Sequence, residues 1–141
     1  MSDTQRAARL LADLAADLSA YRELARLLDE QHTIALRFDG GRLAQLATVI
    51  GDQIAQIDAR RRTRASELGP AQGSLARLQA CVFGDGGTVA QRRELQRHCA
   101  ELEARVAHCA KLATRNGNLL AAQVESVQRV LFGERHTYAP A

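Results

Sequence analysis

Large aromatic side chains are scarce in this chain of 141 residues, which has no tryptophan, two tyrosines and three phenylalanines. So few rings argue against a compact core built on aromatic packing. They also argue against a protein surface on which nucleic-acid bases stack. Leucine, alanine and valine therefore have to supply most of the packing.

Proline and long apolar runs are rare as well. Only two prolines occur, and none lies between Ala71 and Ala139, so nothing forces a helix to break there. No run of about 18 apolar residues is present, and we expect no membrane span. The first twenty residues alternate arginine and aspartate with apolar residues, so we expect no signal peptide.

The three cysteines, Cys81, Cys99 and Cys109, are odd in number. Cys99 and Cys109 are about 15 Å apart along one expected helix, so they cannot form a disulfide with each other. A reducing cytoplasm is the simplest setting for such a set. We interpret Cys99 and Cys109 as small buried apolar residues, with a cross-subunit disulfide or a reactive thiol as the alternative.

Positive charge comes almost entirely from arginine, because Lys111 is the only lysine. The net charge of +3 results from 19 basic and 16 acidic residues that are scattered along the chain. We therefore expect no nucleic-acid partner. The densest cluster, Arg60, Arg61, Arg62 and Arg64, is interpreted as a solvated helix end, with a phosphate site as the alternative.

Residues 88–132 follow the pattern of one long helix, about 65 Å in length. Apolar and small residues recur at alternating steps of four and three, which places them on one stripe of the helix. This stripe, the long-helix seam, comprises Leu95, Cys99, Leu102, Val106, Cys109, Ala113, Asn116, Leu120, Gln123, Val127 and Val130. Capping-box residues Thr88 and Gln91 predict where this helix begins, and Phe132 and Gly133 where it ends.

Further helices precede the long one. Ser2 and Gln5 predict the start of a first helix, and its broad apolar stripe indicates packing against two neighbours. A corner follows at 38–41, where the paired glycines are expected to supply the positive φ of the turn. The second helix should end near Leu68, and a short helix over 74–83 should cover one end of the core.

We therefore predict an all-α fold, an elongated antiparallel bundle of three long helices plus one short helix. Residues 1–133 form a single domain in this prediction, and residues 134–141 form a flexible C-terminal tail.

The sequence offers no clear catalytic site. It has no Gly-rich phosphate loop and no visible pairing of a nucleophile with a base, so we expect neither enzyme activity nor a cofactor. On the long helix, Glu94, His98, Glu101, Arg105 and His108 share one face, which could suggest metal ligands. The other helices lack matching carboxylate and histidine sets, so we interpret this face as solvated and expect no metal.

The C-terminal half of the long helix carries more apolar surface than one seam requires. Asn116 interrupts the seam, where it either fixes the register or marks a wet position. Beyond it lie Leu119, Leu120, Val124, Val127, Val130, Leu131 and Phe132. Either the first helix covers this face, or part of it is left for a partner helix.

The order of these features resembles the FlgN family of flagellar export chaperones over nearly the whole chain. The resemblance is carried by the leucine-rich first helix, the corner at Asp39 and Gly40, and the arginine-rich second helix. The most recognisable pieces are the segment 115–120, which reads Arg-Asn-Gly-Asn-Leu-Leu, and Tyr138 near the end of the chain.

The resemblance implies a cytoplasmic chaperone, not an enzyme, that binds the C-terminal helical segments of the hook-filament junction proteins FlgK and FlgL. It also implies delivery to the type III export gate, with Tyr138 docking on the gate component FlhA. We hypothesise that the substrate-binding residues are Asn116, Leu119, Leu120, Val124, Val127 and Leu131. The alternatives are a FliT-like chaperone of the filament cap protein and a coiled-coil homodimeric scaffold without a secretion role.

Overall fold

The structure is a computed structural model that describes residues 3–68, 75–84 and 86–133. Four helices follow one another along the chain: α1 (Asp3–Leu36), α2 (Gly40–Leu68), α3 (Leu75–Phe83) and α4 (Val89–Phe132). The described residues form no strand. The prediction of an all-α fold with three long helices and one short helix is therefore confirmed.

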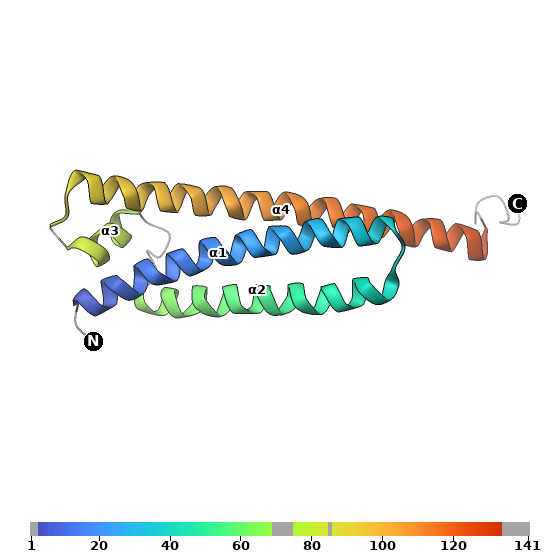
Figure 1. Cartoon of the computed structure of the whole chain (residues 1–141), viewed down its shortest axis with the longest axis horizontal. Coiled ribbons are helices and arrows are strands. Elements are labelled where there is room, and N and C mark those ends of the chain that lie inside the picture. The colour runs from blue at the N-terminus through green and yellow to red at the C-terminus, as the bar shows by residue number, and fades with distance from the viewer. Residues whose placement is uncertain (1–2, 69–74, 85, 134–141) are drawn as a thin grey trace, which may run out of the picture.

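The three long helices alternate in direction along the long axis of the molecule (Figure 1). Each is antiparallel to the next along the chain, so α1 and α4 point in the same direction. Helix α1 lies between α2 and α4 and packs against both, as its broad apolar stripe predicts. The most deeply buried residues of the molecule are spread along this stripe, with Leu10, Asp17 and Ala35 at most 1% exposed.

The core has two parts. The larger one joins all three long helices and includes Leu27 and Leu28 of α1, Leu46 of α2 and Leu112 of α4. The smaller one lies at the end of the rod where α3 packs, and comprises Leu10, Leu14, Leu78 and Leu95. Helix α3 therefore covers one end of the core, as expected; Ser74, its predicted first residue, lies outside the described residues.

The corner between α1 and α2 differs from the expectation. Gly40 and Gly41 do not supply the positive φ, because both already belong to the first turn of α2. Phe38 takes the left-handed conformation instead, with φ of 57°. Asp39 then caps α2, since its Oδ1 accepts a hydrogen bond of 3.0 Å from the backbone N–H of Arg42.

The ends of α4 agree with the sequence. The Thr88 hydroxyl accepts from the backbone N–H of Gln91 at 3.1 Å, and the Gln91 side chain accepts from the Thr88 N–H at 2.9 Å. This reciprocal pair is a capping box. At the other end Gly133 has φ of 70° and its N–H donates to the Arg129 carbonyl oxygen. Ser2 of the capping box predicted for α1 lies outside the described residues.

Candidate protein-binding surface

Helices α1 and α4 are held in register by three side chains of the long-helix seam, which runs along α4. The Cys109 thiol donates to the Tyr21 carbonyl oxygen at 3.3 Å, and the Asn116 amide donates to that of Leu28 at 2.7 Å. The Gln123 amide donates to the Ala35 carbonyl oxygen at 2.7 Å. Donors and acceptors both advance by seven residues, so every pair has the same separation along the chain.

Asn116 is buried in this contact, with 2% of its surface exposed. Its Nδ2 donates to two acceptors, the Leu28 carbonyl oxygen and Gln31 Oε1 at 2.8 Å. Its Oδ1 accepts from Arg115 Nε at 3.1 Å. Of the two roles left open by the sequence, the geometry favours the fixing of register, because the amide is satisfied by protein groups at a unique position.

Cys109 is likewise buried, and burial raises the pKa of its thiol. The group therefore keeps its proton at neutral pH and can donate to Tyr21. Cys99 is half-buried, and burial raises the pKa of its thiol too. Cys81, Cys99 and Cys109 are all free, so Cys109 acts as a small buried residue that also positions a helix.

The long-helix seam of α4 continues beyond the point where α1 ends. Helix α4 has 44 residues and α1 has 34, and the register of the two puts most of the excess of α4 at its C-terminal end. This end projects past the corner between α1 and α2 (Figure 1). We call residues 124–132 the α4 tip. Its last eight residues extend beyond the level of Leu36 by about 12 Å.

Apolar side chains of the α4 tip are exposed: Val124 58%, Val127 50%, Val130 85%, Leu131 67% and Phe132 69%. Glu125 and Arg129 pair with each other on the same segment. Soluble proteins rarely expose neighbouring large apolar residues without a function. The α4 tip is therefore the strongest candidate for a protein-binding surface among the described residues.

The six residues hypothesised to bind substrate divide into three environments. Val124, Val127 and Leu131 lie exposed on the tip, and Leu119 and Leu120 are half-buried just before it. Asn116 lies inside the contact with α1. The hypothesis left out Val130 and Phe132, although Val130 follows Cys109, Asn116 and Gln123 at the same seven-residue step.

Two further exposed apolar residues lie at the adjacent corner. Leu36 ends α1 with 56% exposure, and Phe38 is 72% exposed. Because Gln123 of α4 is hydrogen-bonded to Ala35 of α1, Leu36 and Phe38 lie level with the beginning of the α4 tip. They extend the apolar surface across the end of α1, where the sequence predicted only a turn.

The arginine cluster of α2 is matched by carboxylates. Arg60 Nε and an Arg64 guanidinium nitrogen each lie 2.8 Å from an oxygen of Asp17, whose side chain is 2% exposed. Arg61 and Arg62 pair with Asp58 in the same helix. The cluster is therefore partly an internal ion-pair site and not simply a solvated helix end. Asp17 was not singled out in the sequence, although its position within the stripe of α1 was a signal.

The remaining candidates do not form a reaction centre. Glu94 and His98 are 3.9 Å apart, and Glu101 pairs with Arg22 of α1 at 2.6 Å. Within the described ranges, no three His, Cys, Asp or Glu side chains are grouped as a metal ion requires. None of the described helices is both long enough and apolar enough to span a membrane. Tyr138 lies outside the described residues.

One comparison with known proteins gives a match over nearly the whole chain. A family model described as FlgN protein matches residues 1–132, which is almost the entire chain. No curated protein and no solved structure matches the chain. The family match covers every described helix of the rod. The chain belongs to the FlgN family, and its general role is that of a flagellar export chaperone.

Proposed function

We propose that this chaperone works in the cytoplasm, where it binds the C-terminal helical segments of FlgK and FlgL and delivers them to the type III export gate. The α4 tip is the cargo surface in this proposal. The observation that supports it is that α4 makes side-chain hydrogen bonds to α1 as far as Gln123, and its large apolar side chains from Val124 onward are exposed.

The chemistry of the tip suits an amphipathic helix. Val124, Val127 and Leu131 recur at steps of three and four, so they lie along one face. A cargo helix on this face would occupy the place beside α4 that α1 occupies farther back. Such binding would shield apolar cargo surface that otherwise associates with other copies before export.

The limited extent of this surface favours reversible binding. The uncovered part of α4 is about two turns long, much shorter than its contact with α1. Leu36 and Phe38 at the end of α1 provide additional apolar area for the end of a cargo helix. A short apolar contact allows cargo to be released at the gate, because affinity depends on a few well-packed side chains.

Calorimetric titration of the full chain with C-terminal peptides of FlgK and FlgL tests this proposal. We expect both peptides to bind, and Val127→Asp to weaken binding at least tenfold, because a carboxylate would be buried in an apolar contact. Val89→Asp is the matched control, since Val89 is 68% exposed at the opposite end of α4. This variant should bind like the wild type, and both variants should retain their helix content in circular dichroism.

Three results would contradict the proposal. Preferential binding of a peptide from the filament cap protein would indicate a FliT-like chaperone. A tight dimer in light scattering that ignores all peptides would indicate a scaffold protein. Loss of helix content in Val127→Asp would show that the tip belongs to the folded core.

Docking on the gate component FlhA is a separate part of the proposal, assigned to Tyr138 by resemblance to the FlgN family. We expect Tyr138→Ala to lose binding to purified FlhA and to keep its affinity for the FlgK peptide. If binding to FlhA is unchanged, Tyr138 has no role in docking. The cargo surface at the α4 tip would be unaffected by that result.

A further inference from the structure

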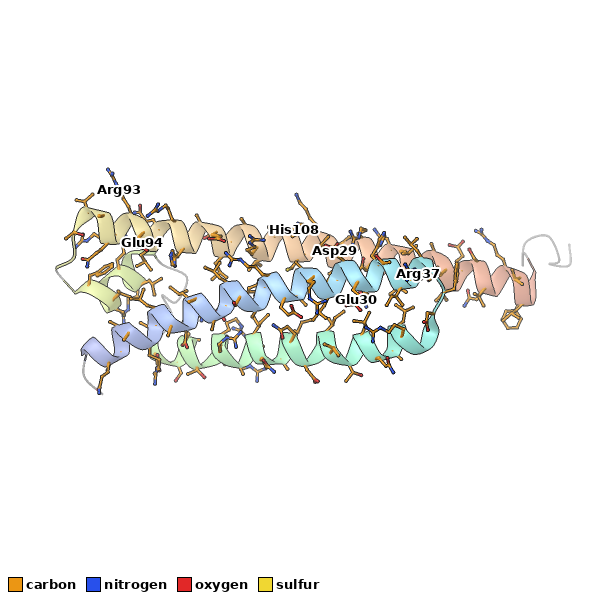
Figure 2. All side chains as sticks on the ribbon, in the orientation of Figure 1. Asp29, Glu30, Arg37, Arg93, Glu94 and His108 are labelled. Carbon is orange, nitrogen blue, oxygen red and sulfur yellow. The ribbon has the colours of Figure 1, made fainter. Side chains whose placement is uncertain are left out.

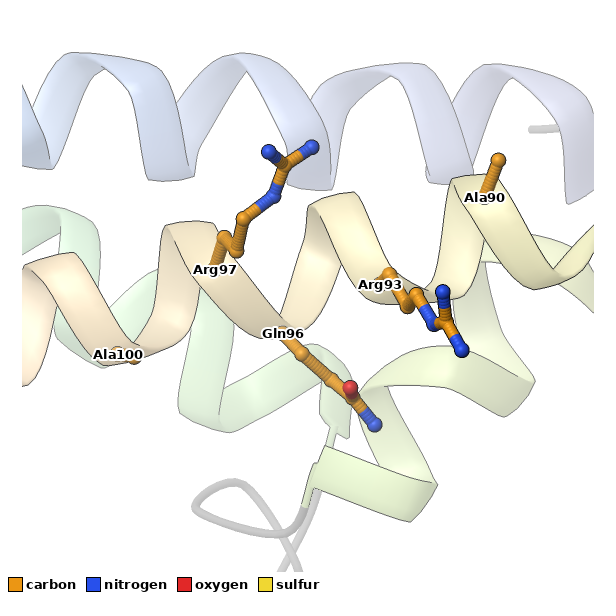
Figure 3. A pocket seen from close by; sticks show the side chains of 5 residues that line it. All are labelled: Ala90, Arg93, Gln96, Arg97 and Ala100. Atoms are coloured by element: carbon orange, nitrogen blue, oxygen red, sulfur yellow. The ribbon is translucent and has the colours of Figure 1, made fainter.

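A second unusual surface lies at the opposite end of α4. Ala90, Arg93, Gln96, Arg97 and Ala100 line a shallow hollow of about 580 Å³. All five side chains come from one stretch of α4, with the arginines and the glutamine between the two alanines (Figure 3). Arg93 lies at the end of the rod far from Arg37, which marks the corner near the α4 tip (Figure 2). We call these five residues the basic hollow.

The arginines of the basic hollow differ from most others in the protein. Arg22 pairs with Glu101 across two helices, and Arg26 pairs with two glutamates of its own helix. Within the part of the chain that the structure describes, no carboxylate pairs with Arg93 or Arg97. Two positive charges therefore remain uncompensated one helical turn apart.

This placement lowers the stability of α4. Like charges four residues apart destabilise a helix. A binding role explains why two arginines stand where isolated helix stability disfavours them.

The chemistry of the basic hollow specifies an anionic partner of small extent. A guanidinium group binds a carboxylate through two parallel hydrogen bonds. The Cβ atoms of Arg93 and Arg97 are about 6 Å apart, which matches carboxylates on successive turns of another helix. Glu94 and Glu103 are exposed on neighbouring turns and would repel an extended polyanion such as duplex DNA or a lipid surface.

The small residues make room for a helical backbone. Ala90 and Ala100 border the arginines without bulky side chains, so a partner helix can approach α4 closely. We propose that the basic hollow is a docking surface for an acidic helix of another protein, in which carboxylates one turn apart pair with Arg93 and Arg97. This inference does not depend on the cargo proposal.

The distance between the two surfaces has a functional consequence. Arg97 and Val127 are 30 residues apart on one continuous helix, or about 45 Å along its axis. Two partners bound at these positions would not touch each other. One chaperone molecule could therefore hold an apolar helix at the α4 tip while the basic hollow is bound to an acidic protein.

Fluorescence anisotropy with a labelled alanine-based peptide tests the inference. The peptide carries glutamates at four-residue spacing, and its matched control carries the same number at two-residue spacing. We expect salt-sensitive binding of the first peptide, at least tenfold tighter than that of the control. Arg93→Glu with Arg97→Glu should weaken it at least tenfold, without loss of helix content, since both side chains are exposed.

The control for total charge is Arg37→Glu with Lys111→Glu. Each replacement of a basic residue by glutamate lowers the net charge by two units. Both double variants therefore have a net charge of −1 instead of +3. We expect the control to bind within twofold of the wild type. If the first double variant fails to fold, Arg93→Gln with Arg97→Gln should show the same loss.

Several results would overturn the inference. The wild type could fail to bind the first peptide at low salt, or both peptides could bind equally well. The two charge-reversed proteins could be weakened to the same degree, which would indicate a general charge effect. Tighter binding of a 20-base-pair duplex or of phosphatidylglycerol vesicles through Arg93 and Arg97 would identify a polyanion surface instead.

Discussion

The side-chain amide of Asn116 in α4 donates to the backbone carbonyl oxygen of Leu28 in α1 at 2.7 Å, and both groups lie inside the molecule. This hydrogen bond is the middle one of the three that set the register of α1 and α4. Because the register decides where α1 ends relative to α4, this hydrogen bond helps to determine which part of the seam remains exposed.

Asn116→Ala should lower the free energy of unfolding by about 1–3 kcal/mol, because it leaves buried acceptors without their donor. Urea denaturation measured by circular dichroism checks this value. Asn118→Ala is the control, since Asn118 is exposed on the same helix, and it should change stability by no more than about 0.5 kcal/mol. Equal effects of the two substitutions would contradict a special role for Asn116.

Asp17→Asn should be more damaging, with a loss of about 3–5 kcal/mol, because Arg64 would keep a charge inside the protein without its carboxylate. The Arg64 side chain is 11% exposed and lies 2.8 Å from Asp17. Asp58→Asn removes a carboxylate that also pairs with two arginines, but at the surface. Urea denaturation should show a much smaller loss for Asp58→Asn; a similar loss would argue against burial as the cause.

Acid should weaken the contact between α1 and α4. A hydrogen bond from Arg22 lowers the pKa of Glu101 below its ordinary value of 4.5. A lowered pKa in the folded state stabilises the protein above the unfolded-state pKa, and this contribution is lost as the pH falls through the folded-state value. Wild type should therefore be more stable than Glu101→Gln at pH 7, and the difference should shrink below pH 4.5.

Urea midpoints at a series of pH values measure this difference. Glu103→Gln is the control, because Glu103 is exposed and makes no hydrogen bond to a described residue. If the difference in urea midpoint between wild type and Glu101→Gln stays constant down to pH 3, the ion pair of Arg22 with Glu101 is not its source.

Phe38→Gly should stabilise the protein by about 1 kcal/mol, because glycine adopts a left-handed conformation without the clash of a Cβ atom. The ring contributes little packing in the isolated chain, as it is 72% exposed. Phe38→Ala removes the ring but keeps the clash, so it should not raise the melting temperature. If both variants melt alike, the backbone conformation of residue 38 carries no cost.

Much of the fold could be predicted because helix ends have local causes. Thr88 and Gln91 form their capping box within one turn, and Gly133 ends α4 through its own backbone conformation. The corner was harder, because glycine permits a positive φ without requiring one. There Asp39 begins α2 by capping it, and the left-handed residue falls on Phe38.

The candidate sites could be predicted only in part. The sequence indicates that Val124, Val127 and Leu131 belong to an apolar face, but not whether α1 reaches them. It also shows four arginines near the end of α2, but not that the buried Asp17, more than forty residues away, accepts a hydrogen bond from Arg60. Contacts between helices decide both questions, and no local pattern records them.

The sequence by itself determined that this protein is a rod of helices with one very long seam, because the period of an α-helix is a property of neighbouring residues. Only the tertiary structure decided that most of the excess length of α4 lies at its C-terminal end. The physical reason is the register fixed by Cys109, Asn116 and Gln123, whose hydrogen bonds to α1 align two helices of unequal length.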